Sequence, residues 1–146
     1  MSALEEVRDF VNTADFEAGE EGLADAAARE VREAIRVLLR AHNGVADGVE
    51  AASAVLDRAS RRAGLRVGFV GGQLSFRSHE RSGVARVLAA VAETMADGSW
   101  SRLKACRSDT CQWAFIDNAR NRSRQWCDMA VCGNREKARR FRSRRA

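Results

Sequence analysis

Residues 106–132 read CRSDTCQWAFIDNARNRSRQWCDMAVC and contain all four cysteines of the 146-residue chain. They form two close pairs, and four residues separate the cysteines within each pair. The pairs are Cys106 with Cys111 and Cys127 with Cys132. Two such pairs, fifteen residues apart, suit a tetrahedral zinc site, because each pair covers one edge of the ion while the connecting segment folds back as a hairpin. The stretch therefore predicts a small module built around one metal ion.

Disulfides and inert buried thiols are the alternatives to a metal site, and the spacing C-x4-C departs from the common C-x2-C. The first residues, MSALEEVRDF, lack the basic start and apolar run of a secretory signal, and no apolar run is long enough to cross a membrane. We therefore expect a cytoplasmic protein without membrane contact, in which cysteines more often bind metal than form disulfides. Four thiolates fill the zinc coordination shell, which predicts a structural zinc ion and no enzymatic activity.

The net charge of +5 conceals a difference between the two ends of the chain. Residues 101–146 contain 13 Lys or Arg and 4 Asp or Glu, whereas residues 1–100 contain 12 and 16. Such a split is typical of a chain in which one part faces a polyanion and the other has a different role. Charge and cysteine content thus predict a helical domain over residues 1–100 and a zinc module over residues 101–146.

Helical patterns dominate the first hundred residues. Apolar side chains recur at helical spacing in residues 4–11, 24–41, 49–63 and 84–96. In the second of these segments Arg and Glu lie on the other side of the helix, and Asp25 is a candidate N-cap. The acidic stretch from Asp15 to Gly22 has no periodicity and is expected to be a loop.

Residues 65–78, LRVGFVGGQLSFRS, change to a period of two around a Gly-Gly dipeptide, which favours a tight hairpin turn. A two-residue turn pairs Phe69 with Leu74 and gathers the apolar side chains of both strands on one face. The expected fold is mainly α with this small β-hairpin, and we expect helices and hairpin to share one core.

A further helix is expected after the last cysteine. Gly133 lets the backbone turn closely past the metal, and Asn134 is a candidate N-cap for a helix over residues 135–144. Together with a knuckle and a hairpin that carries Trp113 and Trp126, this helix predicts a treble-clef-like zinc module. The two tryptophans suit base stacking, although aromatic residues beside zinc knuckles more often form the module's small core.

Basic residues concentrate in the inter-cysteine segment and in the last twelve positions, which hold seven basic residues and one acid. The candidate phosphate-binding residues are Arg120, Arg122, Arg124, Arg135, Lys137, Arg139, Arg140, Arg142, Arg144 and Arg145. A solvated basic helix that binds nothing is the alternative. The expected partner is double-stranded DNA, with RNA or an acidic protein as rivals, and a homodimer is compatible with this function. Asn12 and Thr13 are candidates for a ligand pocket in the helical part, although capping or turn formation explains them equally well.

The stretch CQWAFIDNARNRSRQWCDMAVCGNREKARRF, residues 111–141, closely resembles the CGNR zinc finger, which is named for the tetrapeptide at residues 132–135. The W-x-F-x-D core ending at Asp117, the run NRSR at residues 121–124 and Trp126-Cys127 carry the resemblance. The stretch DFVNT, residues 9–13, is similar to the opening of the ABATE domain, which precedes this finger in the family. The resemblance implies a bacterial, stress-induced transcription regulator with an ABATE-like helical domain and a DNA-binding finger.

Overall fold

The computed structural model describes residues 1–145. Its α-helices are α1 (Ala3–Val11), α2 (Ala26–Ala41), α3 (Val49–Ala63), α4 (Gly83–Asp97) and α5 (Asn134–Arg145). Its antiparallel strand pairs are β1 (Ala14–Asp15) with β2 (Glu20–Glu21), β3 (Arg66–Val70) with β4 (Gln73–Arg77), and β5 (Leu103–Ala105) with β6 (Ala114–Ile116). Short helical turns span Trp100–Arg102 and Met129–Gly133. The expectation of a mainly helical protein with a small β-hairpin is confirmed. Within residues 1–145 no helix is both long and apolar enough to cross a membrane.

Capping residues set the helix boundaries close to where the sequence predicts them. The Asp25 carboxylate accepts hydrogen bonds from the backbone N–H groups of Ala27 and Ala28 at 3.2 Å, so α2 begins where expected. Gly64 ends α3 in the left-handed conformation, at φ +66°. The Ser82 hydroxyl caps α4 in the same way as Asp25 caps α2. Each cap satisfies backbone groups that have no partner inside the helix.

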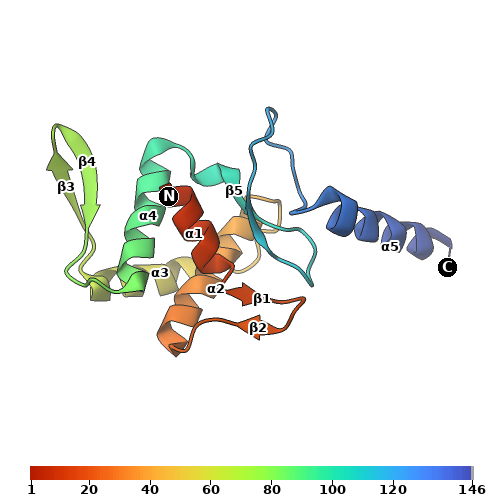
Figure 1. Ribbon diagram of the computed structural model, residues 1–146, viewed down its shortest axis with the longest axis horizontal. Coiled ribbons are helices and arrows are strands. Elements are labelled where there is room, and N and C mark those ends of the chain that lie inside the picture. The colour runs from red at the N-terminus through yellow and green to blue at the C-terminus, as the bar shows by residue number, and fades with distance from the viewer. Residues whose placement is uncertain (146) are drawn as a thin grey trace.

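The main apolar core lies between α1, α2 and α4 and reaches β5 and β6 (Figure 1). Its fully buried large side chains include those of Val7, Val11, Ile35, Leu39 and Leu103. Leu103 belongs to the C-terminal part of the chain, as do the buried alanines of β5 and β6. A pair of three-residue strands cannot bury an apolar face alone, so it packs against the helices. The main core therefore contains residues from both sides of the boundary expected near residue 100.

Two arginines on the charged side of α2 are buried rather than solvated. Arg36 has 2% of its surface exposed and donates hydrogen bonds to the backbone oxygens of Val11, at 2.9 Å, and Gln112, at 2.6 Å. Its guanidinium also lies 4.3 Å from the ring centroid of Phe16. Arg32 is buried as well and forms a bidentate ion pair with Glu21. Arg36 thus supplies donors to two backbone oxygens, and Arg32 forms a charge-assisted pair with a carboxylate.

The stretch after Asp15, expected to be a loop, instead contains the short β1–β2 hairpin. Ala14 is buried, and the ion pair with Arg32 holds Glu21 at the second strand. Hydrogen bonds from Arg32 and from the backbone N–H of Leu23 lower the pKa of Glu21 to about 2. Period-two reasoning misses this hairpin because strands of two residues are too short to show a period.

The β3–β4 hairpin has the predicted register, with Phe69 opposite Leu74, but its apolar face is not part of the core. Phe69 is 76% exposed and Val67 is 59% exposed. The hairpin projects from the body beside α4 (Figure 1), and only residues at its base, such as Leu65, pack against the core. The expectation that helices and hairpin share one core is wrong for the outer half of the hairpin.

We predict that Arg36→Met lowers the free energy of unfolding by about 3 kcal/mol, because it leaves one buried and one partly buried carbonyl oxygen without this donor. Urea unfolding of the zinc-loaded protein measures the change. Arg29→Met on the exposed side of α2 is the matched control and should change stability by less than about 0.5 kcal/mol. Equal effects of the two substitutions would contradict the role given to Arg36.

Candidate metal centre

The four cysteine sulfurs converge at the end of the molecule that carries α5. Cys106 follows β5, Cys111 precedes β6, Cys127 lies in the loop after β6, and Cys132 lies in the turn that leads into α5. All four Sγ atoms are within 4.8 Å of one another. The Sγ atoms of Cys111 and Cys127 are 3.6 Å apart, and those of Cys127 and Cys132 are 3.7 Å apart. The predicted ligands therefore meet in one place.

These separations fit zinc and do not fit disulfides. Four thiolates at about 2.3 Å from a tetrahedral zinc ion lie about 3.8 Å from one another, close to the 3.6 and 3.7 Å of the two nearest pairs. A disulfide would bring two sulfurs to about 2.05 Å, and all four cysteines are free thiols. With four sulfur ligands the coordination shell is closed, so the site suits a structural ion rather than a catalytic one.

Repulsion between the four thiolates also requires a cation at the centre of the cluster. Hydrogen bonds from the Cys111 thiol and from nearby backbone N–H groups lower the pKa of Cys106 to about 5. The hydrogen bond with Cys106 and burial in turn raise the pKa of Cys111, and burial raises that of Cys127 to about 12. Four thiolates cannot coexist at this distance without a positive charge between them. A divalent ion provides that charge and holds all four in the ionised form.

The helix after the second cysteine pair begins differently from the prediction. Asp128, not Asn134, is the cap: its carboxylate accepts a hydrogen bond from the N–H of Ala130 at 2.8 Å, and a turn over Met129–Gly133 follows. Asn134 has helical backbone angles, and its amide donates to the Ala130 oxygen instead. The turn over Met129–Gly133 brings Cys132 close to the other three sulfurs before α5 starts.

Gly133 lies in a crowded position, where any larger residue would require the Met129 side chain to move. A Cβ atom there would come within 2.3 Å of the Met129 Sδ and 3.1 Å of the Trp126 ring. The prediction that Gly133 allows a close turn past the metal is consistent with this geometry. Trp126 and Trp113 are partly buried and pack against the cysteine cluster and Phe115. Their packing favours a role as the module's small core over stacking on bases.

A buried ion pair that sequence reasoning missed organises the loop between the cysteine pairs. The Lys104 ammonium donates to the Asp117 carboxylate at 2.8 Å, and 5% of Lys104 and none of Asp117 is exposed. It also donates to the backbone oxygens of Arg122, at 2.7 Å, and Arg124, at 2.9 Å. Asp117 in turn accepts from the backbone N–H groups of Ala119 and Arg124. One ion pair thus fixes both ends of the loop.

The charge state of Asp117 follows from these contacts. Burial raises its pKa, but the hydrogen bonds from Lys104, Ala119 and Arg124 outweigh burial and keep the pKa below its usual value. The sequence holds a weak signal for this pair, since Lys104 stands between two apolar residues of a short strand and Asp117 directly follows another such strand.

The ten predicted phosphate-binding residues divide into two groups. Four of them contact other groups of the protein: Arg124 (Trp126 and Cys127 oxygens), Arg135 (Glu17 and the Cys132 Sγ), Arg139 (Glu136) and Arg145 (the Phe141 ring). The other six have no ion pair or side-chain hydrogen bond to any residue in the described part of the chain: Arg120, Arg122, Lys137, Arg140, Arg142 and Arg144. The structure thus assigns Arg135 to support of the metal centre, because its guanidinium lies 3.2 Å from a ligand sulfur.

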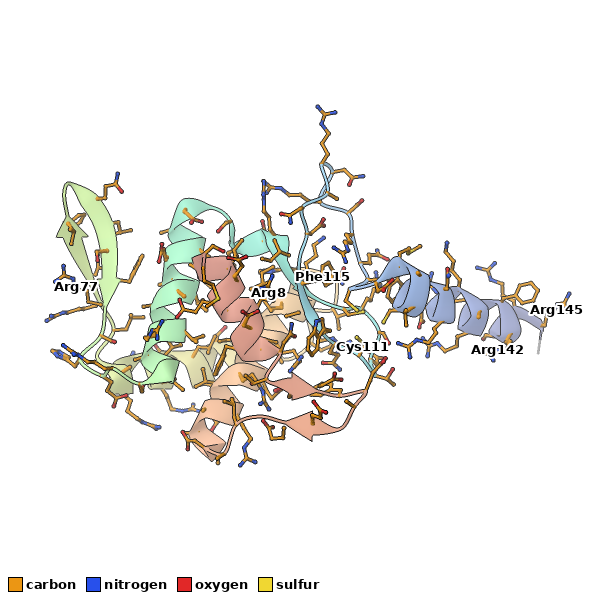
Figure 2. The ribbon with its side chains drawn as sticks, in the orientation of Figure 1. Arg8, Arg77, Cys111, Phe115, Arg142 and Arg145 are labelled. Carbon is orange, nitrogen blue, oxygen red and sulfur yellow. The ribbon has the colours of Figure 1, made fainter. Side chains whose placement is uncertain are left out.

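On α5 the unpaired cations form a stripe. Lys137, Arg140 and Arg144 follow one another at intervals of three and four residues, so they lie on the same side of the helix. We call these three residues the α5 stripe. The helix buries no side chain and extends away from the body, as Figure 2 shows for Arg142 and Arg145. The stripe is therefore open to a large partner.

Asn12 and Thr13 make contacts within the protein. The Asn12 side-chain amide donates to the oxygen of Ala114 at 2.9 Å and accepts from the N–H of Ala114 at 2.8 Å. It thus bonds to the backbone of Ala114 in the same way as the backbone of a neighbouring strand would. Thr13 donates to the Phe10 oxygen and accepts from Arg32. Thr13 thus makes the local turn contact of the alternative interpretation, whereas the Asn12 side chain bonds to a strand distant in the sequence. Asn12 also joins the end of α1 to strand β6 of the zinc module.

We predict that the purified chain carries about one zinc ion and that Cys111→Ser weakens zinc binding more than the roughly 10- to 100-fold loss typical of changing a residue outside the ligand shell. Elemental analysis and competition with a chelator measure the stoichiometry and affinity. Thr110→Ser, at the exposed neighbouring position, should leave both unchanged. A Cys111→Ser protein that keeps one tightly bound ion would count against a four-cysteine site.

We further predict that Lys104→Met costs about 3–5 kcal/mol in the free energy of unfolding, because it leaves a buried carboxylate without its cation. Adding Asp117→Asn to that variant should recover part of the loss, since the uncharged amide is cheaper to bury. Urea unfolding of both variants tests the coupling. A double variant that is less stable than Lys104→Met alone would argue against a buried charge as the cause.

Comparison with known families agrees with this geometry. A family model described as the CGNR zinc finger matches residues 102–145, which include both cysteine pairs, the Lys104–Asp117 ion pair and α5. The match does not extend over residues 1–101, whose ABATE-like character stays a prediction. A search of curated proteins found no significant match. The C-terminal part of the chain, residues 102–145, is therefore a CGNR zinc finger, with its four cysteines arranged to hold one structural zinc ion.

Proposed function

We propose that the chain binds double-stranded DNA through its zinc module and acts, without enzymatic activity, as a regulator of transcription. The observation that carries the proposal is the α5 stripe, in which Lys137, Arg140 and Arg144 are exposed and unpaired among the described residues. Phosphate contacts from Lys and Arg supply most of the affinity of proteins for DNA without regard to sequence. An unpaired stripe can make such contacts without first breaking ion pairs.

The shape of α5 supports DNA as the partner. A helix of twelve residues is about 18 Å long, and a helix with its side chains fits the major groove of B-form DNA. Since α5 buries no side chain, no other element blocks its approach to a groove. The deep and narrow major groove of A-form RNA would not admit it, which favours DNA over duplex RNA.

The loop between the cysteine pairs offers a second contact. Arg120 and Arg122 are exposed on this loop, which the Lys104–Asp117 ion pair holds in place. The loop and α5 are both attached to the metal centre, so the zinc ion would fix the position of one relative to the other. Four thiolates and one divalent ion add a charge of −2, which leaves the large positive surplus of residues 101–146 in place.

We predict that changing the α5 stripe to glutamine (Lys137→Gln, Arg140→Gln, Arg144→Gln) weakens binding to DNA duplexes of different sequence to a similar extent. The slope of log K against log salt concentration should become shallower by about 0.9 for each phosphate contact that is lost. Fluorescence anisotropy at several salt concentrations measures both quantities.

The matched control is Arg66→Gln, Arg77→Gln, Arg81→Gln, which removes the same charge from the β3–β4 hairpin and the segment after it. This hairpin lies at the opposite end of the molecule from α5 (Figure 1), so the control should retain the salt slope of the unmodified protein. Equal losses in both triple variants would show that net charge, not the stripe, governs binding.

Stronger competition by matched RNA than by DNA would favour the RNA alternative. If the protein binds neither DNA nor RNA but does bind an acidic protein, the result would favour the alternative in which the zinc module is an adaptor for protein partners.

A further inference from the structure

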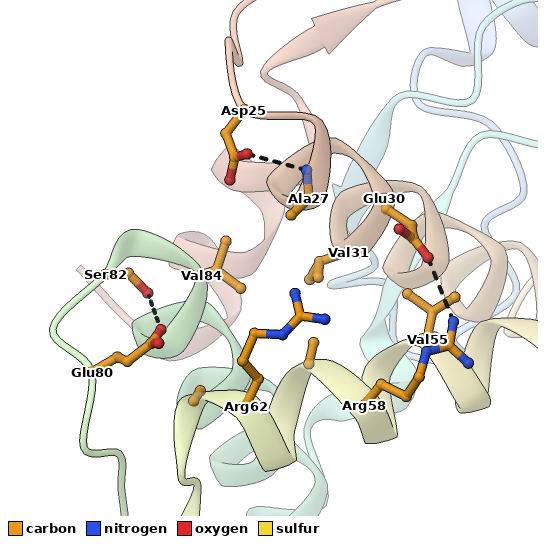
Figure 3. Close-up of a pocket in the computed structure, with 12 residues that line it drawn as sticks. Asp25, Ala27, Glu30, Val31, Val55, Arg58, Arg62, Glu80, Ser82 and Val84 are labelled. Carbon is orange, nitrogen blue, oxygen red and sulfur yellow. Dashed lines mark hydrogen bonds and ion pairs between the residues drawn. The ribbon is translucent and has the colours of Figure 1, made fainter.

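A cleft of about 420 Å³ lies in the helical part of the molecule, at the N-terminal end of α2. It is bounded by α2, by α3 and by the segment that leads into α4 (Figure 3). Its apolar wall includes Val31, Val55, Ala59 and Val84. The volume is in the range of small-molecule sites, which measure roughly 300–1,000 Å³. The cleft is separate from the metal centre, and the proposed DNA-binding function does not use it.

The acidic groups that line the cleft are already partnered. The Asp25 carboxylate accepts hydrogen bonds from the first turn of α2. Glu30 lies 3.6 Å from the guanidinium of Arg58, and Glu80 accepts a hydrogen bond from the Ser82 hydroxyl. Each of these carboxylates thus already has a contact within the protein, although only Glu30 has a cation beside it.

Arg62 differs from these groups. Its guanidinium points into the space between α2, α3 and the segment around Ser82, as Figure 3 shows. Within residues 1–145 it has neither an ion pair nor a hydrogen-bond partner. The neighbouring Arg61, by contrast, pairs with Asp57 on the same helix at 3.2 Å. One cleft thus combines an apolar wall with a single unpartnered cation.

We propose that this cleft binds a small monocarboxylate with a compact apolar body. The planar guanidinium of Arg62 matches a carboxylate and can donate two parallel hydrogen bonds to it. The apolar body then packs against the side chains of Val31, Val55 and Val84. One negative charge matches the one unpartnered cation, whereas a doubly charged phosphate would carry more charge than Arg62 offsets and would meet repulsion from Asp25 and Glu80, which have no cation beside them.

A second hollow of about 370 Å³ adjoins the first and shares Asp25, Ser82 and Val84 with it. Its wall includes Phe10 and Val87, so the apolar surface continues toward α1. A ligand body longer than the first cleft has room to extend in this direction. The choice between short and long acids is therefore set by side chains of α1 and α4, while Arg62 sets the requirement for a carboxylate.

The experiment is a titration of the whole zinc-loaded chain, followed by NMR of backbone amides. The probes are isovalerate, benzoate and phenylacetate, each compared with its neutral amide, isovaleramide, benzamide or phenylacetamide. At least one acid should cause saturable shifts at residues of α2 and α3 beside the cleft, and its amide should bind at least about tenfold more weakly, because it lacks the charge-assisted contact.

Two variants locate the contact. Arg62→Gln should weaken binding of that acid by at least about tenfold, and Arg61→Gln, on the adjacent outward position, should leave it unchanged. Absence of saturable shifts with all three acids would overturn the proposal. So would an amide that binds as tightly as its acid, or an Arg62→Gln protein that binds the acid as the unmodified protein does. DNA binding by α5 is measured separately, so failure here leaves the function proposed for the zinc module untouched.

Discussion

The metal centre depends on one electrostatic constraint, which is that four sulfur atoms lie too close together to be ionised without a cation between them. Around the metal the C-terminal module has only a small core of its own, which consists of the cysteines and three aromatic residues, and α5 buries no side chain. Structural zinc contributes on the order of 10–16 kcal/mol in comparable small domains. A divalent ion therefore determines whether the loop and α5 keep a fixed arrangement. The Lys104–Asp117 ion pair fixes the part of the loop that lies away from the metal.

Besides the apolar packing of β5 and β6 against the helices, the rest of the protein supports the module through polar contacts made by α2 and the turn that follows it. Beyond Arg36, the C-terminal end of this helix contacts the module three more times: Arg40 pairs with Asp109, the His42 ring contacts the Leu103 oxygen at 2.7 Å, and the Asn43 amide donates to the oxygens of Ala105 and Gln125. Burial lowers the pKa of His42, which favours its neutral form in this contact. The N-terminal end of α2 borders the cleft that contains Arg62. One rigid helix therefore spans the distance between the cleft and the metal centre.

The sequence predicts the features that depend on local spacing. The cysteine pairs, the caps at Asp25 and Gly64 and the register of the β3–β4 hairpin follow from residues close together in the chain, and the structure contains all of them. Contacts between a side chain and a distant backbone oxygen leave no such pattern, which is why the roles of Arg36 and Asn12 were missed. The exposure of Phe69 was missed for a related reason, since a period of two shows which side chains share a face but not whether another element covers that face.

The isolation of α5 has a consequence for which substitutions the protein tolerates. Substitutions in a packed helix are limited by the volume and shape of the neighbouring side chains. On α5 that limit is absent from Asn134 to Arg145, because none of these side chains is buried. Substitutions at the outward positions of α5 beyond Arg135 therefore cost little in folding, while the cysteines, Arg135 and the Lys104–Asp117 pair stay under the constraints of folding. The charge and shape of this outer surface can thus be altered by exchanging a few terminal residues while the scaffold stays intact.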